Sequence, residues 1–375
     1  MAFDSPRLLD CRTSSSFVSY VWFAWSAFIT PLTIPMTNSH TVSDYLSPLV
    51  QRRDLGPAQM RTMMEYMMSG HCGDVETGAL LAALRTKGET IEEVATAAAV
   101  LREHMVRWDP GSEEVLDTCG TGGDGLKTFN ISTATALVVA GAGVPVVKHG
   151  NRAVTSRSGS ADVLSELGIH IEGDATTARV SLERAGLAFC YAPLFHPAMK
   201  HVAPVRKRLG IPTIFNCLGP LANPAGAKFQ LLGVGRPELL DLLAGALAIL
   251  AESRAVVVWG EDGLAEVTLS ARTHVRRGTG YEGTALVWSH EDFGLPLCHL
   301  KDLEAESSAE SAALIRRVLV GEDIPATNVV LANAAAALFI AGKAKSPREG
   351  VEQARQAIRA GAAAQVLAKL IELSE

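Results

Sequence analysis

The spacing of hydrophobic positions is helical in the first well-patterned part of the chain. Pro57 fits the first turn of a helix and Gly70 fits its stop. Thr90 and Glu93 have the spacing of a capping box, which predicts the start of a further helix. We therefore predict a helical domain over residues 42–108, part of which later helices could complete.

After residue 109, short β-like runs alternate with Ala-rich helical stretches. The predicted strands cover residues 114–120, 144–150, 187–192, 229–235, 254–260 and 266–270. The last helices are predicted within 327–342 and 347–374, where the Ala/Leu-rich pattern is typical of packing helices. Alternation of this kind predicts an α/β fold, with a mostly parallel sheet in a larger domain over residues 109–375.

The start of the chain differs from the rest. Phe17–Ile29 is strongly apolar, but it is shorter than the roughly 20 residues that a membrane-spanning helix needs. A secretory signal would need a cleavage site, and none is clear. Ordinary globular patterning begins just after Met36. We expect residues 1–41 to be an N-terminal extension that is disordered or that reflects a start assigned too early, with Met36 as the true start.

Composition narrows the classes of protein to which the chain can belong. With 375 residues, of which 48% are hydrophobic, it can bury a large core and is not a disordered protein. The formal net charge of −6 and the lack of a dense Lys/Arg block argue against a nucleic-acid or membrane partner, while small anionic substrates stay open. The six cysteines are scattered without metal-ligand spacing, which fits a reducing, cytoplasmic location.

The strongest local signal is a glycine-rich turn at 117–125 (DTCGTGGDG), between a predicted strand and a helix. Glycine lets backbone N–H groups approach a phosphate, and the following helix adds its positive end. A tight turn that merely needs glycine is an equally good explanation of the glycines alone. The hydroxyl and amide side chains at 128–133 favour binding of phosphate and a divalent cation, although N-capping by Asn130 or Ser132 is an alternative that is compatible with it.

A second polar segment, 148–160, follows the next predicted strand. It contains Lys148, Arg152 and Arg157 together with several hydroxyl groups. Open α/β sheets bind their ligands at the carboxyl ends of strands. A solvated loop would also be polar, but the closeness of this segment to the glycine loop along a β-α-β path favours a shared anion site.

Together these segments closely resemble the anthranilate phosphoribosyltransferase family. The resemblance runs from residue 42 to the C-terminus and includes further matches at 196–206 and 215–224. It implies a nucleoside phosphorylase/phosphoribosyltransferase-type fold, a homodimer paired through the helical parts, and an active site between the domains. The implied reaction converts anthranilate and 5-phosphoribosyl 1-pyrophosphate to N-(5-phosphoribosyl)anthranilate and pyrophosphate in tryptophan biosynthesis, with no nucleophilic residue and no covalent intermediate.

The resemblance also implies site residues, position by position. The family's phosphoribosyl pyrophosphate contacts fall on Gly120, Gly123, Asp124, Thr128, Asn130, Ile131, Ser132, Thr133, Lys148, His149, Gly150, Asn151, Arg152, Ala153, Val154, Thr155, Ser156 and Ser160. Its anthranilate contacts fall on Gly120, Asn151 and Arg206, and Arg206 would pair with the substrate carboxylate. His149, His196 and Arg206 also match positions that line the family's anthranilate entry route, although a lone histidine is more often structural than functional.

The family's magnesium ligands carry over only in part. Ser132 and Glu266 match, but Ala265 stands where the family has an aspartate. Asp262 or Glu261 could reach the site, although neither occupies the family position. Mg²⁺ takes few protein carboxylates and completes its shell with phosphates and water, so the loss of one ligand need not abolish binding.

Two other functions stay open from the sequence. A pyrimidine nucleoside phosphorylase-like enzyme has a related architecture and also attacks ribose C1, but its phosphate and base signatures are not those of this chain. A catalytically impaired binding paralogue, of nucleic acid for example, is suggested only by Ala265. The intact glycine loop and the acidic balance argue against it, and salt-dependent DNA binding would support it.

Overall fold

The computed structural model describes residues 41–111, 114–153, 157–251, 253–278 and 285–374. The helices and strands below all belong to one compact unit, Val42–Glu375. The predictions for residues 1–40, and those for Val154, Thr155 and Ser156, fall outside the described residues. No helix in the described part of the chain is long and apolar enough to cross a membrane.

The described chain starts with a group of helices whose ends follow the sequence signals. They are α2 (Ser43–Val50), α3 (Pro57–Met68), α4 (Asp74–Lys87) and α5 (Ile91–Glu103). The predicted capping box is confirmed: the Glu93 N–H donates to Thr90 Oγ1 (3.2 Å), and the Thr90 N–H donates to Glu93 Oε2 (2.9 Å). Later helices pack on this group, because α10 (Ala203–Leu209) contacts α4, while α11 (Phe215–Leu218) and α12 (Glu238–Leu250) contact α5.

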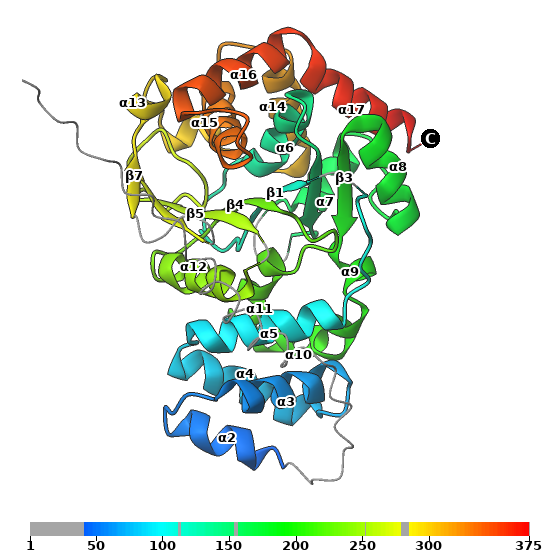
Figure 1. Cartoon of the computed structure of the whole chain (residues 1–375), viewed down its shortest axis with the longest axis vertical. Helices are drawn as coiled ribbons and strands as arrows, with labels where there is room; N and C mark the ends of the chain where they lie inside the picture. Colours follow the sequence, from blue (N-terminus) through cyan, green and yellow to red (C-terminus); the bar gives the residue numbers. More distant parts are fainter. Residues whose placement is uncertain (1–40, 112–113, 154–156, 252, 279–284, 375) are drawn as a thin grey trace, which may run out of the picture. The chain divides into compact units, whose positions relative to one another are not determined.

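A seven-stranded sheet forms the centre of the remaining chain, in the order β3-β2-β1-β4-β5-β6-β7 (Figure 1). Its strands are β1 (Leu116–Gly120), β2 (Val146–Gly150), β3 (Leu187–Tyr191), β4 (Phe229–Gly233), β5 (Arg254–Gly260), β6 (Thr273–Arg277) and β7 (Leu286–Trp288). The pairs from β3 to β5 are parallel, and those of β6 are antiparallel. The predicted fold class, a helical N-terminal part plus a mostly parallel α/β part, is confirmed. The strand order reverses between β1 and β4, and ligands bind at such switch points in open α/β sheets.

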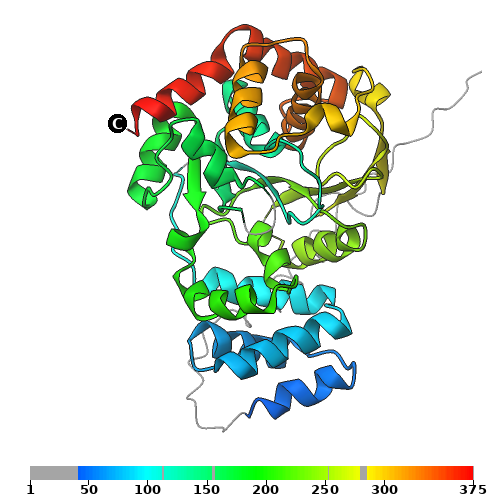
Figure 2. The same ribbon diagram turned by 180° about the vertical axis from the view of Figure 1, so that it is seen from behind.

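Helices cover both faces of the sheet (Figures 1 and 2). One core contains residues of the sheet and of α6 (Ile131–Gly141), α7 (Ser160–Glu166), α14 (Ser308–Leu319), α15 (Pro325–Ile340), α16 (Pro347–Arg359) and α17 (Ala362–Glu372). The other face packs on α5, α11 and α12. Val256 and Val258 belong to the first core and Val257 to the second, because successive side chains of a strand point to opposite faces.

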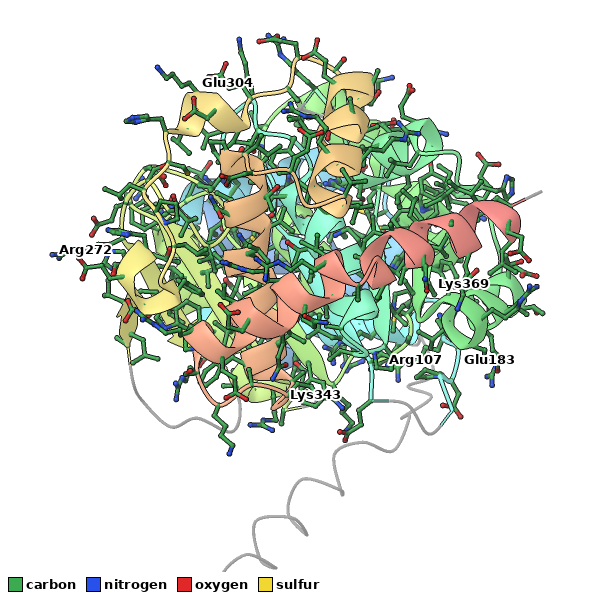
Figure 3. The ribbon with its side chains drawn as sticks, turned by 90° about the horizontal axis from the view of Figure 1, so that it is seen from above. Arg107, Glu183, Arg272, Glu304, Lys343 and Lys369 are labelled. Atoms are coloured by element: carbon green, nitrogen blue, oxygen red, sulfur yellow. The ribbon has the colours of Figure 1, made fainter. Side chains whose placement is uncertain are left out.

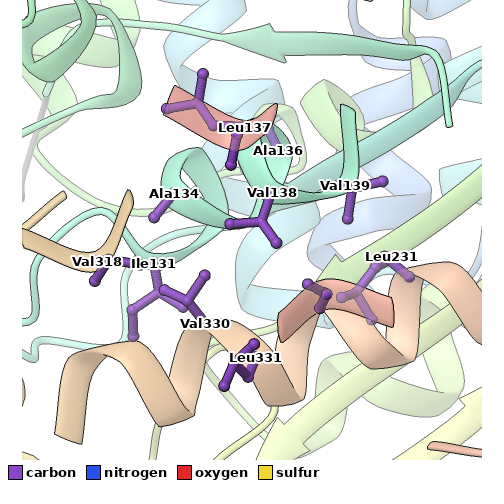
Figure 4. Packing of buried hydrophobic residues seen from close by; sticks show 14 of the residues in the cluster. Ile131, Ala134, Ala136, Leu137, Val138, Val139, Leu231, Val318, Val330 and Leu331 are labelled. Carbon is purple, nitrogen blue, oxygen red and sulfur yellow. The ribbon is translucent and has the colours of Figure 1, made fainter. Parts of the chain in front are cut away.

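The two long C-terminal stretches are helical as predicted, the second of them being divided into α16 and α17. Figure 4 shows Ile131 and Val138 of α6 packed near Val330 and Leu331 of α15, so the helix after the glycine loop is buried between helices and sheet. Seen from above, labelled charged side chains such as Arg272 and Lys369 lie on the outside of the molecule (Figure 3).

The remaining short elements connect these layers. They are α8 (Ala175–Ala185), α9 (Ala192–Phe195), η1 (Pro197–His201), η2 (Gly219–Leu221), α13 (His290–Phe293) and η3 (Leu300–Leu303). Helix α8 packs on β3, and η1 packs on α3 and α10.

The prediction of a strand at 266–270 is wrong. These residues form an irregular segment between β5 and β6. Val267 and Leu269 are buried, which explains the alternating pattern. However, the Val267 N–H donates to Asn333 Oδ1 (2.9 Å) and its carbonyl accepts from Asn333 Nδ2 (2.9 Å), so a side chain takes the place of a neighbouring strand. The antiparallel strands β6 and β7 were not predicted.

Candidate active site

The glycine loop leaves β1 at the switch point of the sheet. Gly122, Gly123 and Gly125 have φ values of +60°, +76° and +73°, which side chains other than glycine rarely adopt. A Cβ on Gly120 would lie 3.0 Å from the carbonyl oxygen of Gly233, so β1 and β4 approach closely here. The exposed loop backbone can therefore offer N–H groups to an anion, whereas the N–H groups of residues 130–133 at the start of α6 already have acceptors.

Asp124 holds the turn of this loop. Its Oδ1 accepts a hydrogen bond from the Leu126 N–H (3.1 Å), and its carboxylate also accepts one from the Ala265 N–H. Burial raises the pKa of Asp124. These contacts fix the glycine loop to the segment that carries Glu266.

Lys148 lies buried between β1 and α6. Its ammonium group donates to the carbonyl oxygen of Thr118 and to Ser132 Oγ (3.2 Å), and the residue is 3% exposed. Burial lowers the pKa of Lys148, while the negative charges of Asp117 and Glu266 counteract that shift. A cation is thus held beneath the predicted phosphate-binding surface.

Glu266 faces the same group from the segment after β5. Burial raises the pKa of Glu266 to about 8; the charge of Asp124 adds to this, whereas Lys148 and hydrogen bonds from Ser132 oppose it. Ser132 Oγ and the Glu266 carboxylate are hard oxygen donors, which fit Mg²⁺ when phosphates and water complete its shell. In the described part of the chain, no group of three or more His, Cys, Asp or Glu could hold a metal ion.

In the structure, the two substitutes that the sequence suggested for the missing aspartate both have other partners. Glu261 is engaged with His274, whose Nε2 lies 2.9 Å from Glu261 Oε1. Asp262 accepts a hydrogen bond from Thr268 Oγ1 (2.6 Å). Ala265 itself is buried and contributes no oxygen side chain. The carboxylate whose charge raises the pKa of Glu266 belongs instead to Asp124.

The second polar segment is joined to the start of α6, the helix that follows the glycine loop. Asn130 Nδ2 donates to the carbonyl oxygen of Ser158 (3.3 Å), and Ser158 Oγ donates to Asn130 Oδ1 (2.9 Å). Ser160 Oγ donates to the carbonyl oxygen of Asn151 (3.4 Å). The two segments therefore line one surface at the carboxyl ends of β1 and β2.

Asp162 shapes the second segment and was missed in the sequence. Its Oδ2 accepts from the N–H groups of Ala153 (2.8 Å) and Gly159 (2.9 Å), and its Oδ1 accepts from Arg152 (3.2 Å). A Cβ on Gly159 would lie 2.4 Å from the Ala153 nitrogen, so the loop closes tightly here. An acidic residue in the first turn of a helix after glycine is the signal that could have found it.

Asp117, the first residue of the glycine-rich turn, was given no role from the sequence and is buried below the site. Its Oδ2 accepts from Asn223 Nδ2 (2.8 Å), and its Oδ1 accepts from the His149 N–H (3.3 Å). Burial raises the pKa of Asp117 to about 6, although Lys148 and Asn223 oppose the shift. Asp117 joins β1 to the end of β2 and to the connection before β4.

His149 and His196 lie in contact, with ring centroids 4.9 Å apart. His149 Nδ1 donates to the carbonyl oxygen of Gly219 (3.1 Å), and its buried Nε2 has no hydrogen-bond partner among the described residues. Burial lowers the pKa of His149 to about 3 and that of His196 to about 4. Both rings are therefore neutral near pH 7.

Arg206 lies on α10, which follows His196 through η1. Its guanidinium lies 5.3 Å from the centre of the Phe215 ring, and Nη2 donates to Asn216 Oδ1 (3.4 Å). Burial lowers the pKa of Arg206, and no described carboxylate counteracts it. A partly buried cation without an anionic partner fits a ligand that carries a carboxylate.

The comparisons with known proteins agree with this arrangement. Residues 112–364 match the glycosyl transferase family a/b domain, and residues 43–105 match the helical bundle domain of that family. The anthranilate phosphoribosyltransferase of Parvibaculum lavamentivorans is 46% identical over 336 residues, which cover 90% of this chain and 97% of that protein.

Two solved structures are similar over comparable lengths. Anthranilate phosphoribosyltransferase from Thermus thermophilus has a TM-score of 0.83 at 39% identity, covering 88% of this chain and 99% of that one. The enzyme from Saccharomyces cerevisiae, solved in complex with PRPP and Mg, has a TM-score of 0.83 at 29% identity and covers 90% of this chain and 98% of that one. The chain belongs to the anthranilate phosphoribosyltransferase family.

Proposed function

We propose that this chain transfers the phosphoribosyl group of phosphoribosyl pyrophosphate to the amine of anthranilate, in tryptophan biosynthesis. The proposal depends on one observation: the start of α6, after the glycine loop, is hydrogen-bonded to the second polar segment at the switch point. We call the glycine loop with the start of α6, and the second polar segment, the two phosphate-binding segments. The chain also matches transferases of this name over nearly their full length. None of the relatives named above is a nucleoside phosphorylase, and the glycine loop is intact, so neither alternative gains support.

The reaction breaks the bond between ribose C1 and a pyrophosphate oxygen, whose electron pair leaves with pyrophosphate. The amine nitrogen forms the new bond to C1 and releases one proton. Loop N–H groups near Gly120 and Gly123, together with the Lys148 ammonium, would stabilise the negative charge that grows on pyrophosphate. Arg206 would hold the substrate carboxylate, and Asn151 would help to keep the amine in line.

Ser132 and Glu266 would hold Mg²⁺, together with oxygens of the substrate. The bound ion would offset charge on the departing pyrophosphate. Lys148 would keep Ser132 Oγ oriented toward the site, since it donates to that oxygen. The relative from Saccharomyces cerevisiae, solved with PRPP and Mg, supports this use of the ion.

No residue of the site needs to act as a nucleophile. Cys119, at the end of β1, is buried, and burial raises the pKa of its thiol well above the usual range. A thiol in this state is a poor nucleophile. We therefore expect direct displacement without a covalent enzyme intermediate, and mass spectrometry of quenched turnover mixtures should detect no ribosylated protein.

We also propose that the protein is a cytoplasmic homodimer that pairs through its helical part and acts on small molecules alone. Light scattering on a sizing column should give twice the chain mass. A monomer that is fully active would contradict the proposed assembly without affecting the proposed reaction.

The activity is tested by the loss of anthranilate fluorescence when purified protein starting at Met36 is mixed with phosphoribosyl pyrophosphate over a range of Mg²⁺ concentrations. We expect loss that depends on both substrates and on Mg²⁺. Product identity is checked by mass spectrometry. If no fluorescence is lost at any Mg²⁺ concentration while phosphoribosyl pyrophosphate still binds, the chain is a binding protein and not this transferase.

A further inference from the structure

The segment Leu303–Ala305 lies along residues 127–129, between the glycine loop and α6, and has no part in the proposed reaction. The Phe129 N–H donates to the carbonyl oxygen of Leu303 (2.8 Å), and the Ala305 N–H donates to that of Lys127 (2.8 Å). Thr128 and Glu304 form an antiparallel bridge. Figure 3 shows Glu304 at the outside of the molecule, so this segment covers residues 127–129 from their outer side.

The same part of the chain continues into α14, whose first turn carries Ser311. Ser311 is fully buried, at 0% exposure. Its hydroxyl donates to Asn130 Oδ1 (2.8 Å) and accepts from the Asn130 N–H (2.9 Å). Ser311 therefore holds both the backbone and the side chain of the residue at the start of α6.

Asn130 is also held from its other side, by the second phosphate-binding segment. Ser158 Oγ donates to the same Oδ1 (2.9 Å), and Asn130 Nδ2 donates to the Ser158 carbonyl oxygen (3.3 Å). An amide whose oxygen accepts from two hydroxyl groups cannot flip without losing both bonds. The Asn130 amide is thus fixed in one orientation, and among the described residues its Nδ2 has one acceptor, the Ser158 carbonyl oxygen.

A second link between the two segments runs through Glu306 and carries less weight. Glu306 accepts from Lys127 Nζ (3.4 Å) and pairs with Arg157. All these side chains are exposed, and exposed ion pairs contribute little to stability or position. The stronger link between the two segments is therefore the pair of bonds from Asn130 to Ser158, and the buried Ser311 holds Asn130 in place for it.

We propose that Ser311 is a positioning residue for a pyrophosphate-bearing ligand. Its hydroxyl fixes the Asn130 amide and, through Ser158, sets the separation of the two phosphate-binding segments. The identity of the ligand rests on the proposed function, whereas the positioning role rests on these contacts alone.

The test compares Ser311→Ala with Ser307→Ala. Ser307 caps the same helix, because its Oγ accepts from the Glu310 N–H (3.2 Å), but it does not bond Asn130. Calorimetry measures binding of phosphoribosyl pyrophosphate with Mg²⁺, and of pyrophosphate with Mg²⁺. KM for each substrate and thermal unfolding are measured on the same preparations.

We expect Ser311→Ala to weaken binding of both ligands by about 5-fold to 30-fold, as loss of one or two buried hydrogen bonds predicts, with KM for anthranilate unchanged. Ser307→Ala should lower thermal stability without changing ligand affinity. Unchanged affinity in a folded Ser311→Ala would overturn the proposal, as would equal losses in the two variants.

Two further variants keep the test independent of folding and of the proposed function. Ser158→Ala removes the opposite hydroxyl donor, so it should weaken binding to a similar extent, and combining it with Ser311→Ala should cost less than the sum of the two. Strictly additive effects would count against a shared action through Asn130. If the unaltered protein binds pyrophosphate but not phosphoribosyl pyrophosphate, the proposed reaction fails while the role of Ser311 stands.

Discussion

At the scale of single residues, Arg206 offers the sharpest test of substrate recognition. Its positive charge is partly buried and is not balanced by a described carboxylate. We expect Arg206→Gln to raise KM for anthranilate about 10-fold to 100-fold, because a charge-assisted hydrogen bond to a carboxylate contributes roughly 1.5–3 kcal/mol. Steady-state kinetics with each substrate varied in turn measures this.

The matched control is Arg208→Gln on the same helix. Arg208 is exposed and pairs with Asp74 (3.1 Å), so its loss should leave both KM values near those of the unaltered protein. If Arg206→Gln changed KM for phosphoribosyl pyrophosphate instead, or if both variants behaved alike, Arg206 would not be the anthranilate contact.

Ala265 is the residue at which this chain departs from its family. Ala265→Asp would add a third carboxylate beside Glu266 and Asp124, in a place that is already desolvated. We expect this variant to unfold at a lower temperature without Mg²⁺ and to lower the Mg²⁺ concentration at half-maximal activity several-fold. Ala265→Asn, which has the same shape without the charge, is the control. A variant that keeps the original Mg²⁺ dependence would show that position 265 does not face the ion.

At the scale of elements, the sequence predicted the loops better than the contacts that hold them. The glycine loop, the second polar segment and the parallel strands all have local signals, namely glycine, hydroxyl side chains and short apolar runs. Ser311 has no such signal, because its bond to Asn130 spans 181 positions. The bond from Asn223 to Asp117 spans 106 positions and was missed for the same reason.

The prediction of a strand after β5 was wrong for a different reason. Alternating burial of Val267 and Leu269 looked like a strand, yet a side chain on α15 satisfies the backbone. Alternating hydrophobic residues indicate that one side of a segment is buried. They do not indicate which group forms hydrogen bonds with its backbone. The error matters for function, since this segment carries Glu266.

Asn333 of α15 holds this segment, and its replacement tests that role. Asn333→Leu would leave the buried N–H and C=O groups of Val267 without partners, which should lower the free energy of unfolding by about 2–5 kcal/mol. Urea unfolding measures the loss, and Mg²⁺-dependent ligand affinity should fall with it because Glu266 is no longer held. The control is Asn328→Leu, at a partly exposed position of α15. Equal stability of the two variants would contradict the role given to Asn333.

At the scale of the whole molecule, the switch point between β1 and β4 decides where the functional groups meet. β1 supplies the glycine loop, β2 supplies Lys148, and the segment after β5 supplies Glu266. Several ionisable side chains are buried near the carboxyl ends of these strands. The stability of the fold must therefore depend on pH, and His149 gives the clearest instance.

The pKa of His149 is about 3 in the folded protein, below its ordinary value of 6.5, because the ring is buried. As pH falls from 6.5, the unfolded chain therefore binds a proton that the folded protein does not, and stability is lost. The difference amounts to about 1.4 kcal/mol per pH unit for one histidine.

His149→Asn keeps a donor for the Gly219 carbonyl and removes the titrating ring, so its stability relative to the unaltered protein should rise as pH falls from 6.5 toward 4. The other buried groups are present in both proteins: Asp117 and Glu266, whose raised pKa values act in the opposite sense, and His196, whose lowered pKa acts in the same sense. Urea unfolding at several pH values measures the difference, with His170→Asn at an exposed position as the control. A difference between His149→Asn and the unaltered protein that stays constant from pH 8 to pH 4 would mean that the buried ring takes up its proton in the folded state, and that the space around it admits water.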